Sequence, residues 1–168
     1  DNGVRQNGWF DPDHNEIVYR SNRDSNAVLK TLLHEAQHAV QYAEGFAEGG
    51  TLNFGYVILF NQYFDEAIKQ PEYQRLKTPR GRLNFIDRYI RAQNGGESID
   101  SLKERTYSAI YGEQEARSVM ERQDLTANER RENRPFAGDS DSIIADYREQ
   151  LSQYEKNLLE TGLGADIV

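Results

Sequence analysis

The chain has 168 residues, which fits one domain with a substantial core, and we expect a single domain over residues 1–168. Its formal net charge is -8, which disfavours nucleic acid and anionic membrane surfaces as main partners. Cysteine is absent from the sequence, so disulfides, thiolate zinc sites and cysteine nucleophiles are excluded.

Localisation follows from what the sequence lacks. It contains no apolar run near the roughly 20 residues that a membrane-spanning helix requires, and no recognisable signal peptide. The absence of cysteine is compatible with a reducing compartment, and we expect a cytoplasmic protein. The opening residues Asp1-Asn2-Gly3 lack an initiator methionine, which suggests a piece of a longer gene product.

Two short strands are predicted near the start of the chain. Turn signals at Asn7-Gly8 and Asp11-Pro12-Asp13 separate Trp9-Phe10 from the β-prone run 16–19. A long helix follows, because apolar residues recur at helical spacing from Val28 to Ala43. Gly45 ends this helix, and its N-cap lies among Ser21, Asn22, Asp24 and Ser25.

Helices are also predicted for most of the remaining chain, separated by glycine and proline breaks. The glycine-rich stretch 45–55 is interpreted as a loop. The helices are expected at about 56–69, ended by Pro71, at 83–93, from Ser98 or Ser101 to Gln123, and at 141–160. The polar residues 128–142 are expected to form a linker or an extended segment.

The segment His34-Glu35-Ala36-Gln37-His38 has the spacing of a metal-binding motif. Histidines four residues apart project from one face of a helix, where both imidazoles can bind one Zn²⁺ ion. Glu35 is placed to act on a zinc-activated water as general base without being a ligand. The pattern therefore predicts catalytic Glu35 and metal ligands His34 and His38; the alternative is two histidines that face solvent or fill the core.

A catalytic zinc normally takes a third protein ligand, which must come from elsewhere in the chain. Glu44 is one candidate, although the glycine and histidine of the extended metzincin motif are absent at positions 41 and 44. The better donors lie in the later helix, at Glu113 or Glu115. These two side chains diverge by about 200° on a helix, so only one of them can face the metal.

The later segment resembles the gluzincins, in which a glutamate on a second helix is the third ligand and is followed by x-x-Ala and a polar residue. Glu113-Gln114-Glu115-Ala116-Arg117 fits that pattern, and the resemblance implies that Glu113 binds the metal. Arg117 stands where the family usually has Asp or Asn, which leaves the partner of the first histidine unassigned.

A wider resemblance extends over about two thirds of the chain. The segments 8–10, 16–19, 31–41 and 112–117 are similar to the zincin-like domains of large polyvalent proteins from phages and mobile elements. This resemblance implies a peptidase embedded in a longer polypeptide, the rest of which is one candidate substrate.

Together these observations predict a mostly helical α+β fold of zincin type, with a small N-terminal sheet packed on the His34 helix and a second ligand-bearing helix. The expected function is a zinc-dependent metallopeptidase that acts on a protein or peptide. Two alternatives stay open: a zincin-like binding or scaffold module that cleaves nothing, and a metal-dependent hydrolase of a non-peptide amide.

Three further positions are weighed beside the motif. His14 lies in a turn, where a solvent-facing role is expected over metal binding. Tyr107 and Tyr111 could donate to an oxyanion, although core packing is the expected role of each. The strand Glu16–Tyr19 could be the edge that pairs with an extended peptide.

Overall fold

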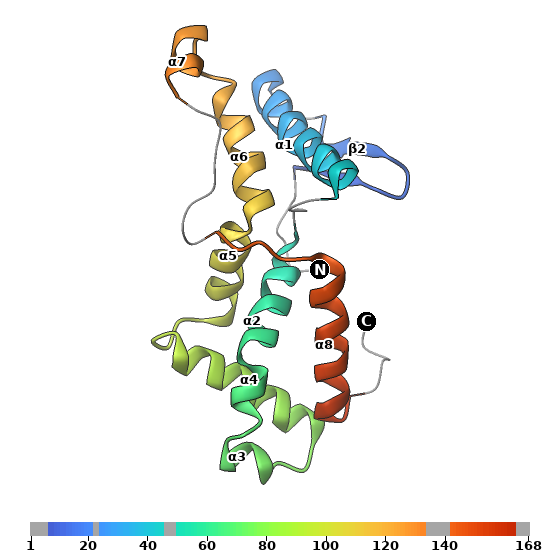
Figure 1. Ribbon diagram of the computed structural model, residues 1–168, viewed down its shortest axis with the longest axis vertical. Helices are drawn as coiled ribbons and strands as arrows, with labels where there is room; N and C mark the ends of the chain where they lie inside the picture. The colour runs from blue at the N-terminus through green and yellow to red at the C-terminus, as the bar shows by residue number, and fades with distance from the viewer. Residues whose placement is uncertain (1–6, 22–23, 46–49, 134–141, 164–168) are drawn as a thin grey trace. The chain divides into compact units, whose positions relative to one another are not determined.

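The computed structural model describes residues 7–21, 24–45, 50–133 and 142–163 (Figure 1). The described chain is mostly helical and contains one two-stranded antiparallel sheet, which confirms the α+β prediction. It divides into two compact units, formed by residues 1–49 with 109–144 and by residues 50–108 with 145–168. Each unit is described by itself, and the expectation of a single domain stays a prediction. No helix among the described residues is both long and apolar enough to cross a membrane.

The sheet of the first unit consists of strands β1 (Gly8–Asp11) and β2 (Glu16–Tyr19), close to the predicted positions. The strands pair with Trp9 opposite Val18 and Phe10 opposite Ile17. The Asp11 carboxylate accepts a hydrogen bond from the backbone N–H of Asp13 at 3.0 Å, which stabilises the turn between the strands. Both strands contact the following helix, α1.

Helix α1 (Ser25–Glu44) carries the His-Glu-x-x-His segment. Its N-cap is Asp24, whose carboxylate accepts a hydrogen bond from the backbone N–H of Ala27 at 2.9 Å. Gly45 ends the helix in the left-handed conformation, with φ at 64°. The predicted helix and both of its end signals are therefore confirmed, and its two buried residues are Glu35 and Gln41.

The helix predicted to run unbroken to Gln123 is wrong, because the structure has two helices there, α5 (Ile99–Ala109) and α6 (Tyr111–Arg122). They are separated at Ile110, which has extended backbone angles and forms a parallel β-bridge with Ile143. The backbone N–H of Ile143 donates to Ala109 and that of Tyr111 donates to Ile143. These two bonds replace helical bonds at the break.

The linker prediction for residues 128–142 is partly wrong, because helix α7 (Ala127–Glu132) occupies its beginning. Thr126 and Glu129 form a capping box, in which each side chain accepts a hydrogen bond from the backbone N–H of the other residue. Six residues are enough for this helix because its N-terminal donors are satisfied locally. Residues 134–141 of the predicted linker lie outside the described residues.

Helices α1 and α6 lie side by side and run in opposite directions (Figure 1). Near the start of α1, Lys30 pairs with Asp124 at 2.5 Å, just beyond the end of α6. Near the end of α1, the Gln41 amide donates to the carbonyl of Gly112, in the first turn of α6, at 2.9 Å. These contacts fix the register of the two helices, so that the middle of α1 faces the first turn of α6.

The second unit contains helices α2 (Leu52–Ala67), α3 (Pro71–Gln74), α4 (Pro79–Gln93), α5 and α8 (Tyr147–Thr161). Helix α2 packs against both α4 and α8. The hydrophobic core of this unit consists of Leu59, Phe60, Phe64, Ala67, Tyr73, Phe85, Ile86, Ile90 and Leu102.

Three predicted helices of this unit begin at a different residue in the structure, and one short helix was missed. Helix α2 begins at Leu52 after the Thr51 cap, so part of the expected loop 45–55 is helical. Pro79 begins α4 instead of breaking the chain, because proline suits the first helical position. Helix α8 begins at Tyr147, where Asp146 is the cap, and the short helix α3 was not predicted.

Candidate metal centre

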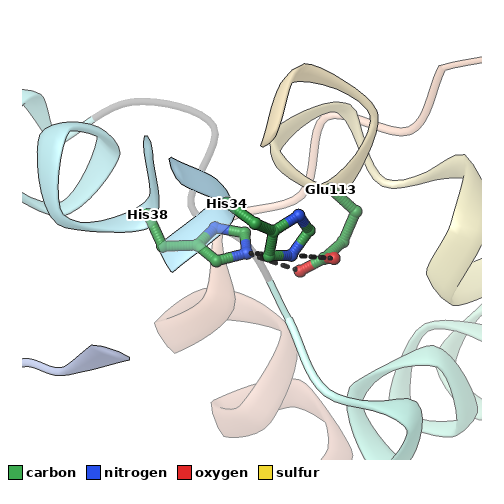
Figure 2. A group of neighbouring side chains, drawn as sticks. All are labelled: His34, His38 and Glu113. Atoms are coloured by element: carbon green, nitrogen blue, oxygen red, sulfur yellow. Dashed lines mark hydrogen bonds and ion pairs between the residues drawn. The ribbon is translucent and has the colours of Figure 1, made fainter. Parts of the chain in front are cut away.

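Three side chains from α1 and α6 converge on one point (Figure 2). His34 and His38 lie one turn apart on α1, and their Nε2 atoms are 3.1 Å apart. Glu113, in the first turn of α6, places Oε2 3.6 Å from Nε2 of His34 and Oε1 3.4 Å from Nε2 of His38. All three residues belong to the first compact unit.

The donor set and its spacing fit a zinc ion. Two imidazole nitrogens and one carboxylate are ligands that catalytic zinc takes in proteins, with a further position left for water. Donor atoms bound to one tetrahedral zinc at ordinary bond lengths lie about 3.3 Å apart. The two Nε2 atoms are 3.1 Å apart, and each lies 3.4–3.6 Å from one of the two Glu113 oxygens, with Oε2 facing His34 and Oε1 facing His38. With one donor atom taken from each residue, all three donors lie within 4.8 Å of one another, so the group is compact enough to surround one ion.

The burial of Glu113 also favours a cation at this point. Its side chain is only 1% exposed, and a buried carboxylate is costly unless positive charge or hydrogen bonds compensate it. The imidazoles of His34 and His38 are its near neighbours, and Nη2 of Arg117 lies 4.0 Å from Oε2. Arg117, the residue that departs from the gluzincin pattern, is thus placed beside the carboxylate and adds positive charge there.

Glu35 lies beside this group and is 8% exposed. Burial raises the pKa of Glu35 above its usual value, and the negative charge of Glu113 acts in the same direction. The electrostatic influence of His34 and His38 and a hydrogen bond from the Phe10 backbone lower the pKa. All three candidate ligands therefore influence the pKa of the Glu35 carboxyl group.

Strand β1 approaches Glu35 because position 8 is glycine. A Cβ atom built on Gly8 would lie 2.6 Å from Cγ2 of Thr31 and 2.8 Å from the carbonyl oxygen of Val18. It would also lie 3.5 Å from Cγ of Glu35. The missing side chain therefore permits the close contact between β1 and α1 that brings the Phe10 backbone to the Glu35 carboxylate.

The outer edge of β1, away from β2, is the edge nearest to Glu35. The backbone N–H of Arg20 donates to Asn7, and hydrogen-bonded pairs alternate along an antiparallel ladder. The N–H of Phe10 therefore points away from β2, in agreement with its hydrogen bond to Glu35. The sequence interpretation considered β2 (Glu16–Tyr19) as a possible peptide-pairing edge, which stays a prediction; the strand whose backbone faces Glu35 is β1.

The other candidate ligands lie apart from the three converging side chains. Glu115 accepts a hydrogen bond from the Gln41 amide at 2.8 Å, and Glu44 is exposed near the end of α1. His14 has a side chain that is 72% exposed and is paired with Asp11, Nδ1 to Oδ2, at 2.9 Å. Within the described ranges, the one group of acidic and histidine side chains with metal-binding geometry is His34, His38 and Glu113.

The two tyrosines considered as oxyanion donors, Tyr107 and Tyr111, belong to different compact units. Tyr111 begins α6, two residues before Glu113, and its backbone N–H is committed to the bridge with Ile143. Tyr107 lies on α5 in the second compact unit. Oxyanion stabilisation by either tyrosine stays a prediction.

Sequence reasoning missed the role of Gln41, which it considered only as a departure from the metzincin motif. Gln41 is 1% exposed, and its Oε1 lies 2.9 Å from Nδ1 of His38. The available signal was spacing: position 41 is one turn beyond His38 on the same helix face. A polar residue at that spacing can contact the ring nitrogen that the metal does not use.

Comparison with known proteins adds no relative. No family model matches the chain, and searches of curated proteins and of solved structures give no match. The resemblances to gluzincins and to domains of polyvalent proteins therefore stay predictions.

Proposed function

We propose that the chain is a zinc-dependent metallopeptidase in which His34, His38 and Glu113 hold the ion and Glu35 is the general base. The observation that carries the proposal is the convergence of three donor groups from α1 and α6 beside a second buried carboxylate. A purely structural zinc site has no use for that second carboxylate, whereas hydrolysis requires it.

When bound, zinc supplies Lewis acidity, which polarises a carbonyl group and favours deprotonation of water. The protein supplies the remaining steps. Glu35 accepts a proton from the attacking water and delivers it to the nitrogen of the leaving amine. The Phe10 backbone N–H faces the Glu35 carboxylate and lowers its pKa, which favours the ionised, proton-accepting form.

Strand β1 supports a peptide as the substrate. In the two-stranded sheet one edge of β1 pairs with β2, and an extended peptide could pair with backbone groups of the other edge beyond Phe10, whose N–H faces Glu35. Such pairing would hold the peptide straight and bring one of its carbonyl groups to the centre. A small non-peptide amide would make no use of this edge.

The test combines zinc analysis with cleavage of a peptide library. The wild-type protein is expected to hold about one zinc per chain and to cleave peptides. Glu35→Gln should keep the zinc and lose about 10²–10⁴-fold in kcat, the usual contribution of a general base. Glu104→Gln, the same change at an exposed position of α5, is the matched control and should match the wild type.

Three results would contradict the proposal. A wild-type protein that binds no zinc removes the metal centre. A zinc-loaded protein without activity on peptides supports the scaffold alternative, and full activity of Glu35→Gln removes the assigned general base.

A further inference from the structure

The buried amide of Gln41 connects the candidate metal centre to α6. Its Oε1 faces Nδ1 of His38 at 2.9 Å. Its Nε2 lies 2.9 Å from the carbonyl oxygen of Gly112 and 2.8 Å from Oε2 of Glu115. With 1% of its surface exposed, Gln41 depends on these partners to replace water.

The partners on α6 determine which way the amide is oriented. The Gly112 carbonyl can only accept a hydrogen bond, so the Gln41 atom that faces it must be the NH₂ group. The Glu115 carboxylate accepts from the same group, which uses both of its hydrogens. The atom that faces His38 is therefore the amide oxygen.

This orientation determines the tautomer of His38. An amide oxygen can only accept, so Nδ1 of His38 must carry the proton and donate it to Gln41. In the neutral ring, Nε2 then has a free lone pair. Nε2 is also the atom that faces His34 and Glu113.

We propose that Gln41 is a positioning residue that holds His38 in the Nδ1–H tautomer, so that Nε2 is presented as a metal ligand. Glu115 and the Gly112 carbonyl hold the Gln41 amide in the required orientation. The proposal takes its metal from the function proposed above, but the tautomer follows from hydrogen bonds within the chain. In this proposal Glu115 holds the Gln41 amide, whereas the sequence had suggested Glu115 as an alternative metal ligand.

The experiment reads the tautomer directly by ¹⁵N NMR of the histidine rings in the metal-free protein at mildly alkaline pH. Zinc affinity is measured in parallel by competition with a chelator. Gln41→Leu removes the acceptor at similar size. Gln41→Glu combined with Glu115→Gln restores an acceptor for His38, with the new amide at 115 donating to the new carboxylate at 41. The Gly112 carbonyl loses its donor in this double variant, so its recovery is expected to be partial. Gln62→Leu, at an exposed position of α2, is the matched control.

The wild type and Gln62→Leu are expected to show His38 as the Nδ1–H tautomer. Gln41→Leu should lose this preference and bind zinc about 10–100-fold more weakly, the usual effect of removing a partner behind a metal-binding histidine. The double variant should recover the tautomer and part of the affinity. Recovery would separate the hydrogen bond from a general effect of packing.

Two results overturn the proposal: a wild-type His38 in the Nε2–H tautomer, or a folded Gln41→Leu protein that keeps both the tautomer and the zinc affinity. The wild-type spectrum alone decides the first result, even if a variant fails to fold. A protein with the expected tautomer but no peptidase activity contradicts only the proposed function. An active peptidase with Nε2–H at His38 overturns only this inference.

Discussion

Oε1 of Glu113 lies 3.4 Å from Nε2 of His38, which joins the first turn of α6 to the motif on α1. The neighbouring glutamate, Glu115, is instead hydrogen-bonded to the Gln41 amide. The two acidic residues of this turn thus have different partners, as expected for side chains that diverge on a helix. We therefore expect Glu113 to bind the metal and Glu115 to hold the Gln41 amide in place.

Glu113→Gln is therefore expected to abolish stoichiometric zinc binding, because it replaces the charged ligand with a neutral amide of the same size. Glu115→Gln should weaken binding by about 10-fold, at the lower end of effects from outer partners of a ligand. Glu44→Gln, at an exposed position, should bind as the wild type does. Elemental analysis and chelator competition measure all three. Loss of zinc in Glu115→Gln with retention in Glu113→Gln would reverse the assignment.

The sequence predicts best those features that depend on residues close together in the chain. Both strands and α1 were located from local patterns, because Asp24, Gly45 and the turn at Asp11 act within a few residues of themselves. The pairing of His34 with His38 follows in the same way from helical spacing. The segment that carries the candidate chemistry was therefore found without knowledge of the rest of the fold.

Features that depend on distant residues were missed or left open. The break at Ile110 is stabilised by Ile143, a contact 33 positions away in the chain, and the nearby Gly112 is too weak a local signal to locate the break. Gly55 suggested a loop, yet it lies inside α2, where a Cβ would come within 2.5 Å of the Lys103 carbonyl oxygen. The choice between Glu113 and Glu115 likewise depends on how α6 packs on α1, which no local pattern determines.

Gly8→Ala is expected to destabilise the first unit, because the added methyl group would clash with Thr31 and with the Val18 carbonyl. Overpacking of this kind typically costs about 1–3 kcal/mol, and urea denaturation would measure it. Combining Gly8→Ala with Thr31→Ser removes the Cγ2 clash but keeps the Thr31 hydroxyl bond to Ala27. Partial recovery is expected, since the Val18 clash stays. An unchanged unfolding midpoint in Gly8→Ala would show that β1 does not need this close approach.

The pair of Asp11 and His14 gives a pH-dependent prediction away from the metal centre. The hydrogen bond and charge of Asp11 raise the pKa of His14, and the same hydrogen bond lowers the pKa of Asp11. NMR titration should show the His14 pKa falling towards its ordinary value in Asp11→Asn, which keeps an acceptor for the turn. Asp13→Asn should cause a smaller change, because its effect on His14 is the weakest of the causes. Equal shifts in the two variants would contradict the pairing.

The signs of these pKa shifts define where the pair contributes to stability. A raised histidine pKa stabilises the fold below the ordinary value of 6.5, and this contribution is lost as the pH rises through the folded pKa. A lowered aspartate pKa stabilises above the ordinary value of 3.8, and this is lost as the pH falls through the folded pKa. The contribution is therefore greatest between these values. It should also decrease with added salt, because the pair lies at the surface, with His14 72% and Asp11 31% exposed.

Zinc itself is expected to stabilise the first unit, because its three candidate ligands join α1 to α6. A ligand that binds only the folded state adds about 2.7 kcal/mol when its free concentration is 100 times Kd. Thermal unfolding with zinc and with a chelator should show this difference in the wild type and not in Glu113→Gln. Hydrogen exchange should slow most at the amides of α1 and α6. An equal rise in Tm for both proteins would mean that zinc acts elsewhere on the chain.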